Sequence, residues 1–91
     1  MSEDFEGFRA RKLAQGFDEV LVRTWEPLFE NTTHSHPFDT DAVVVEGEYW
    51  LTMGSKVTHL KVGDTFSVGR DVPHAERYGP KGAVFWAARK N

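Results

Sequence analysis

Two stretches of the chain decide its fold: residues 32–47, TTHSHPFDTDAVVVEG, and residues 63–78, GDTFSVGRDVPHAERY. Each combines a run of β-branched or aromatic residues with Gly, Asp or Pro positions at which a chain turns. The same pattern continues outward, and we expect seven short strands at residues 20–25, 42–45, 49–53, 57–60, 65–68, 74–78 and 83–89. Turn signals separate them at residues 46–47, 54–55, 63–64, 69–71 and 79–82. Short strands at this spacing predict an all-β fold, an antiparallel sandwich or barrel.

Only the N-terminal part of the chain has helical character. Helix-forming residues predominate over residues 4–15, and Gly16 follows where a C-terminal cap belongs. Phe5, Phe8 and Leu13 fall broadly on one side of a helical wheel. We therefore predict a short N-terminal helix.

The length and composition indicate one small folded domain. The chain has 91 residues, of which 40% are hydrophobic and 27% charged, and a chain of this size holds a single core. We assign residues 1–19 to a helical segment and residues 20–89 to the barrel. Because such a core is thin and 13% of the residues are aromatic, we expect a homodimer.

Charge and cysteine content exclude several classes of partner and site. Eleven basic and 14 acidic residues give a net charge of −3 without any basic block, so we expect no nucleic-acid partner. The absence of Cys excludes disulfides, thiolate metal sites and a cysteine nucleophile, which leaves N and O ligands for any metal. The acidic start of the chain and the shortness of its apolar runs predict a cytoplasmic protein with no membrane partner.

Three histidines have a spacing that can be interpreted. His34 and His36 are separated by one residue, and on an extended strand such side chains point to the same face. Pro37 favours an extended backbone just before it. His74 begins a later expected strand, so the three imidazoles can meet at one metal ion if the first segment is extended. His59 occupies an exposed strand position that needs no function. The largest aromatic side chains are assigned to the core or a dimer face, with one or two of them lining the pocket: Trp25, Trp50, Phe66, Phe85 and Trp86.

In order and separation these pieces resemble the two motifs of the cupin superfamily. The first motif is represented by HSHP at residues 34–37 followed by AVVVEGE at 42–48, and the second by GDTFSV at 63–68 followed by VPH at 72–74. The resemblance covers residues 32–78, about half of the chain. It implies a small antiparallel jelly-roll barrel whose interior holds one divalent metal ion, which could be Fe, Mn, Ni, Cu or Zn. By analogy, the ligands are His34, His36 and His74.

The chain departs from the family pattern at the expected carboxylate ligand. Thr40 stands where the resemblance implies a Glu. A site of three histidines alone is ranked first, and Glu76 second because it shares strand parity with His74. Asp41 is ranked third because it requires a one-residue shift of the loop.

Two kinds of function compete. The resemblance favours a metalloenzyme of oxygenase, isomerase or lyase type that acts on a small anionic or chelating substrate, with Glu76 or Tyr78 as the nearest acid or base. The alternative is a cupin that binds a small ligand without turnover, such as a sensor. A purely structural barrel is favoured only if no metal is bound.

Overall fold

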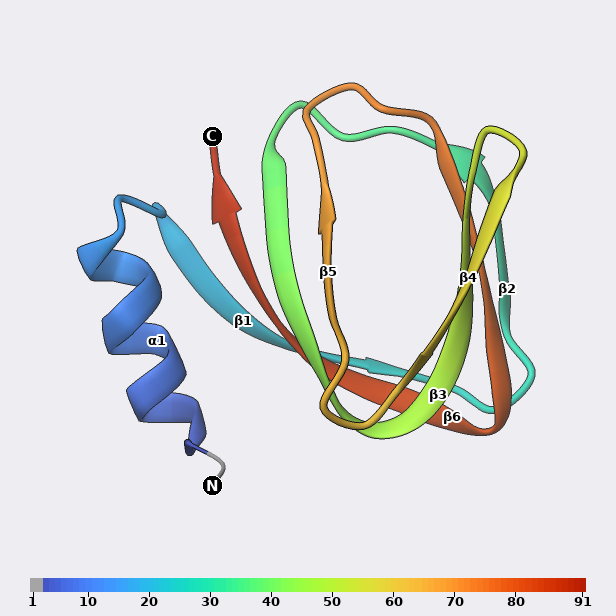
Figure 1. Ribbon diagram of the computed structural model, residues 1–91, viewed down its shortest axis with the longest axis horizontal. Coiled ribbons are helices and arrows are strands. Elements are labelled where there is room, and N and C mark those ends of the chain that lie inside the picture. Colours follow the sequence, from blue (N-terminus) through green and yellow to red (C-terminus); the bar gives the residue numbers. More distant parts are fainter. Residues whose placement is uncertain (1–2) are drawn as a thin grey trace.

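The computed structural model describes residues 3–91, in which one helix precedes six strands (Figure 1). In chain order the elements are α1 (Phe5–Ala14), β1 (Glu19–Trp25), β2 (Glu30–His34), β3 (Asp39–Met53), β4 (Lys56–Lys61), β5 (Thr65–Val68) and β6 (His74–Lys90). The strands pair in the order β1-β6-β3-β4, with β2 added to β6 and β5 added to β3. All of these pairings are antiparallel, and the sheet curls into a barrel (Figure 1). The predicted all-β jelly roll with a short N-terminal helix is confirmed.

Two predicted turns, at residues 46–47 and 79–82, are wrong. In each case the two strands expected on either side of the turn form one long bent strand. Strand β3 runs for 15 residues through Gly47, and β6 runs for 17 residues through 79–82. At Gly47, with a φ of 71°, a Cβ would lie 2.0 Å from the carbonyl oxygen of Gly82. Glycine there lets the two backbones approach closely at the bend. This glycine therefore marks an irregular strand pairing and not a turn that reverses the chain.

The bend changes which residues face the interior. On β3 the buried residues are Ala42 and Val44 before Gly47 but Tyr49 and Leu51 after it, which reverses the strand parity. The register between β3 and β6 shifts on both sides of this glycine. Each long strand therefore supplies side chains to two walls of the barrel.

Strand β2 was not among the predicted strands. Its residues, ENTTH, are polar and mostly exposed, so the apolar alternation that identifies a strand is missing. Glu30 nevertheless pairs with Arg77, and His34 with His74, along the edge of β6. Pairing with a neighbouring strand, and not local hydrophobicity, makes this segment a strand.

The predicted helix is confirmed, but the side on which it packs is partly different. Asp4 caps the helix by accepting a hydrogen bond of 2.8 Å from the backbone of Gly7, and Phe8 is buried against Trp86. Leu13, which falls on the same side of the helical wheel as Phe5 and Phe8, is 36% exposed, whereas Lys12 is 7% exposed. The side of the helix that packs against the strands carries residues 5, 8 and 12, so its third member is Lys12 and not the adjacent Leu13.

The core lies between the walls of the barrel, and the helix lies outside it. The most completely buried large side chains are Tyr49, Tyr78, Leu51 and Val44. Figure 1 shows α1 beside β1 and the C-terminal end of β6, on the outer surface of the sheet. Within residues 3–91 no helix has the length and apolar character needed to cross a membrane.

Candidate metal centre

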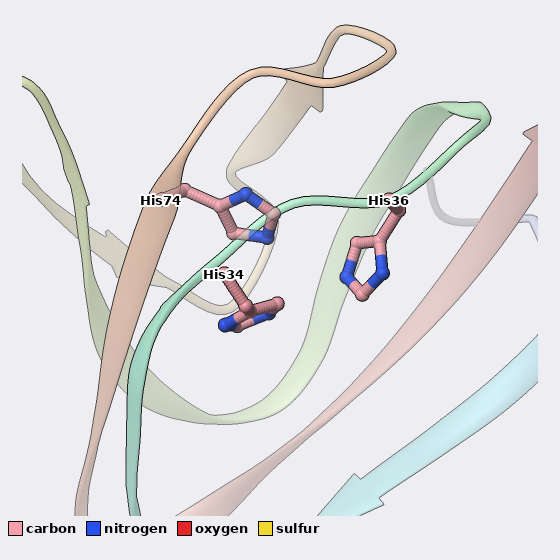
Figure 2. Close-up of side chains that lie close together, drawn as sticks. All are labelled: His34, His36 and His74. Atoms are coloured by element: carbon pink, nitrogen blue, oxygen red, sulfur yellow. The ribbon is translucent and has the colours of Figure 1, made fainter.

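Three histidines converge at one end of the barrel. His34 ends β2, His36 lies in the following loop, and His74 begins β6, where it pairs with His34. Their side chains point toward one another (Figure 2), and each offers a nitrogen within 4.8 Å of the other two. The structure thus brings together the three histidines that the sequence analysis selected.

Backbone carbonyls define the tautomers of two of these imidazoles. His34 Nδ1 lies 2.6 Å from the carbonyl oxygen of Thr32, and His74 Nδ1 lies 3.0 Å from that of Val72. A carbonyl only accepts, so in the neutral ring each Nδ1 carries the proton and each Nε2 keeps its lone pair. This arrangement is typical of histidines that bind a metal through Nε2, because the second hydrogen bond orients the ring.

His36 is held differently. Its ring is stacked on Phe38, with 4.9 Å between centroids. Partial burial lowers the pKa of His36, and positive charge on His34 or His74 would lower it further. The neutral imidazole, which is the form that binds metal, is therefore favoured. Three neutral nitrogen donors fit a divalent transition metal with open positions for water or substrate.

Glu76 is the carboxylate on the histidine side of the barrel. Its side chain is 9% exposed, and Asn31 Nδ2 donates a hydrogen bond of 3.1 Å to Glu76 Oε1. The same oxygen lies 3.7 Å from His34 Nε2. Inward parity with His74, expected from the sequence, therefore brings this carboxylate beside the three imidazoles.

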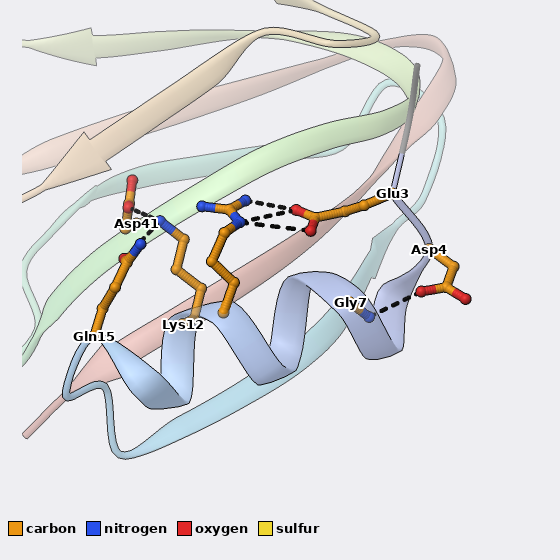
Figure 3. Close-up of polar contacts among 7 residues, drawn as sticks. Glu3, Asp4, Gly7, Lys12, Gln15 and Asp41 are labelled. Carbon is orange, nitrogen blue, oxygen red and sulfur yellow. Dashed lines mark hydrogen bonds and ion pairs between the residues drawn. The ribbon is translucent and has the colours of Figure 1, made fainter.

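The Asp41 alternative is wrong. Thr40 lines the cavity beside the histidines, whereas Asp41 lies on the opposite face of β3. There its carboxylate pairs with Lys12 (Figure 3). It also accepts a hydrogen bond of 3.0 Å from Ser67 Oγ. The one-residue loop shift that would turn Asp41 inward does not occur.

Tyr78 points into the barrel but lies in the core, away from the cavity wall. Its ring is stacked on Trp25 and on Tyr49, each with 5.2 Å between centroids. Among the described residues its hydroxyl has no hydrogen-bond partner, and burial, followed by the charge of Glu76, raises the pKa of Tyr78 well above its ordinary value. The phenol therefore stays protonated near neutral pH.

His59, expected to have no role in a site, is exposed on the outer surface. Its ring is stacked on Trp50 with 4.4 Å between centroids, and His59 Nε2 lies 3.0 Å from the carboxylate of Glu48. The other aromatic residues divide between core and surface: Phe85 is in the core, Trp25 and Phe66 pack against it, and Trp86 lies under the helix. Only part of the set assigned to a core or dimer face is therefore in the core.

A small cavity of about 80 Å³ adjoins the three histidines. Its walls combine aromatic and polar side chains, and they include two arginines that the sequence did not single out, Arg23 and Arg89. Arg23 shares strand parity with Trp25, and Arg89 shares it with Phe85, two aromatic residues assigned to burial. Alternation could therefore have placed both arginines inside.

Solved structures similar to this chain share its fold. A conserved protein with a double-stranded β-helix domain from Klebsiella pneumoniae subsp. pneumoniae MGH 78578 is 28% identical, with a TM-score of 0.67 over 78% of this chain and 64% of that one. An RmlC-like cupin from Shewanella frigidimarina NCIMB 400 is 26% identical, with a TM-score of 0.65 over 78% of this chain and 65% of that one. A structure of the DMSP lyases RdDddP and RnDddQII is 20% identical, with a TM-score of 0.72 over 79% of this chain and 37% of that one.

The comparisons also show limits of length and of sequence similarity. The chain spans somewhat less than two thirds of the length of both the Klebsiella and the Shewanella chains. No protein-family profile and no curated protein sequence matches it. The order of its strands, its curled antiparallel sheet and these structural likenesses agree, and the chain belongs to the cupin superfamily.

Proposed function

We propose that the chain is a metal-dependent cupin enzyme of oxygenase, isomerase or lyase type, acting on a small anionic or chelating substrate. His34, His36 and His74 hold one divalent ion in this proposal. The observation that carries it is the pair of Nδ1 hydrogen bonds to backbone carbonyls, which leaves two Nε2 lone pairs free beside a third imidazole. When bound, the ion supplies a Lewis acid that polarises a substrate oxygen.

Glu76 is the proposed acid or base. Asn31 orients its carboxylate, which lies within 4 Å of His34 Nε2 and hence next to a substrate held at the imidazoles. A carboxylate in this position can take a proton from the substrate and return it to another atom. Aromatic walls from Phe38, Phe66 and Phe85 limit the access of water to this step.

The role proposed for Tyr78 is narrower than that of Glu76. Because its phenol stays protonated, it acts as a hydrogen-bond or proton donor and not as a base. Its hydroxyl lies in the core and has no partner among the described residues, so a contribution requires contact through a water or through the Glu76 carboxylate. Tyr78→Phe separates these roles, since it keeps the stacked ring and removes only the hydroxyl.

The metal content of untagged protein tests the proposal directly. The protein is stripped with a chelator and reconstituted separately with Fe, Mn, Ni, Cu and Zn, and bound metal is measured by elemental analysis. We expect one of these ions to bind at one per chain. Substoichiometric binding of all five would contradict the proposal.

A second candidate function is a cupin that binds its ligand without turnover. Thr40 supplies a hydroxyl where the family resemblance implies a carboxylate, and Tyr78, whose hydroxyl is buried, is not among the residues that line the cavity. Few groups are therefore available for proton transfer. A small acid that stabilises the metal-loaded protein but is recovered unchanged after long incubation, with and without O₂, would favour this function; its conversion would favour the enzyme.

A homodimer is part of the proposal. Among the described strands, β1 pairs only with β6, so its other edge is free, and Val22 on this strand is 51% exposed. Free strand edges are favourable sites for pairing with a second copy. Light scattering of untagged protein should give twice the chain mass of 10.4 kDa, and a single-chain mass from micromolar to millimolar concentration would contradict the dimer.

A further inference from the structure

Two arginines line the cavity, and the proposed function gives them no role. Arg23 on β1 and Arg89 on β6 both contribute to its wall. Across residues 3–91, neither guanidinium forms an ion pair within 4.0 Å of a carboxylate. Positive groups that enter a partly buried cavity without such a partner carry a desolvation cost that a bound anion would offset.

Aromatic rings of the same cavity hold both guanidinium groups. The guanidinium carbon of Arg23 lies 4.9 Å from the ring centroid of Trp25, and that of Arg89 lies 4.5 Å from the ring centroid of Phe38. Such contacts use the face of a planar cation and reduce its freedom. The N–H groups in its plane stay available for an anion, and the planar fork matches a carboxylate.

The charges in the cavity are unevenly distributed. Burial and the like charge of Arg23 lower the pKa of Arg89, an effect that Glu19 partly opposes. Among residues 3–91, the one carboxylate in the cavity wall is Glu76, which is hydrogen-bonded to Asn31 and lies beside His34. The arginine side of the cavity therefore has positive charge in excess, and a metal ion at the histidines would add to it.

We propose that Arg23 and Arg89 bind a carboxylate of the substrate, and that the substrate is a short-chain acid with a second oxygen-bearing end, such as a dicarboxylate or an oxo acid. The second end reaches the histidines, and this half of the assignment rests on the proposed function. The cavity volume of about 80 Å³ restricts the substrate to a small molecule. Arg23 and Arg89 are specificity-determining residues in this arrangement.

Isothermal titration of metal-loaded protein, freed of unbound metal, tests the assignment with succinate and its dimethyl ester. The ester lacks both charged carboxylates of succinate, and a charge-assisted contact to arginine favours succinate by about tenfold or more. Arg23→Gln and Arg89→Gln should each remove most of this preference while metal affinity stays unchanged. Arg77→Gln is the matched control, because Arg77 stacks on Trp50 on the outer surface and should keep the preference.

The wild-type comparison needs no variant, so a variant that fails to fold does not rescue the proposal. Equal affinity for succinate and its ester in the wild type would overturn it, as would an equal loss in Arg77→Gln. The same titration on metal-free protein with propionate and propionamide distinguishes the two proposals. If no metal binds but propionate is still preferred through Arg23 and Arg89, the arginine site stands and the metal enzyme fails.

Discussion

Two polar clusters lie on opposite faces of the same strand, β3, and they differ in how completely their groups are paired. On the outer face Lys12 forms an ion pair with Asp41 (Figure 3), and the remaining carboxylate oxygen of Asp41 accepts a hydrogen bond from Ser67. On the inner face, beside Thr40, His34 and His74 keep free Nε2 positions next to His36, and within residues 3–91 two arginines lack a carboxylate partner. The polar groups of the outer cluster are paired with one another and hold the helix against β3. The inner cluster still has groups that are free to bind a ligand.

The strongest test of this difference is the response of stability to metal. A ligand that binds only the folded state stabilises it by about 4 kcal/mol at a free concentration of 1,000 Kd. We expect the metal identified by reconstitution to raise the Tm of the wild type and a chelator to reverse the change. If none of the five metals changes the Tm, the inner cluster does not bind metal, and the proposed difference between the two clusters is contradicted.

Removing one imidazole should have the next largest effect, which is a loss of metal affinity. In His74→Ala the metal affinity should fall by more than the roughly 10- to 100-fold that loss of an outer hydrogen-bond partner causes. His59→Ala is the control, because His59 lies on the outer surface with Glu48 and should leave metal affinity unchanged. Metal titration of both variants checks the result, and equal losses would contradict the assignment of His74.

A substitution in the outer cluster should lower the stability of the fold and leave metal binding unchanged. Asp41→Asn leaves the buried ammonium of Lys12 without its charged partner, which we expect to cost about 2 kcal/mol, or about 8–16 °C in Tm. Metal affinity should not change. The double variant Lys12→Met, Asp41→Leu removes both charges and should recover most of the loss, and thermal denaturation measures both effects. A loss of metal affinity in Asp41→Asn would restore Asp41 as a ligand.

The smallest expected effect on metal affinity belongs to Glu76→Gln. If three imidazoles suffice, affinity should fall by less than tenfold, about 1.4 kcal/mol, even though the charge beside His34 is lost. Glu48→Gln, on the outer surface, is the matched control. A larger loss measured by metal titration would make Glu76 the fourth ligand and not only an acid or base.

Local sequence predicted much of the fold but not its irregular parts. Strand alternation identified most of the strand segments, and the capping pattern identified the helix. Polar β2 was missed because pairing with β6 defines it, and Gly47 was interpreted as a turn because a glycine at a bend and a glycine at a turn have the same local signal. Lys12 replaced Leu13 on the buried side because a distant partner, Asp41, neutralises its charge.

The candidate site divides in the same way. The amino-acid sequence by itself determined that an extended segment would direct His34 and His36 to one side, because side chains alternate along an extended backbone. Only the tertiary structure decided that Glu76 and not Asp41 would lie beside them, and that Arg23 and Arg89 would line the same cavity. Side-chain direction can be counted along one regular strand, but not through the register shifts of β3 and β6 or between strands that meet only when the barrel closes.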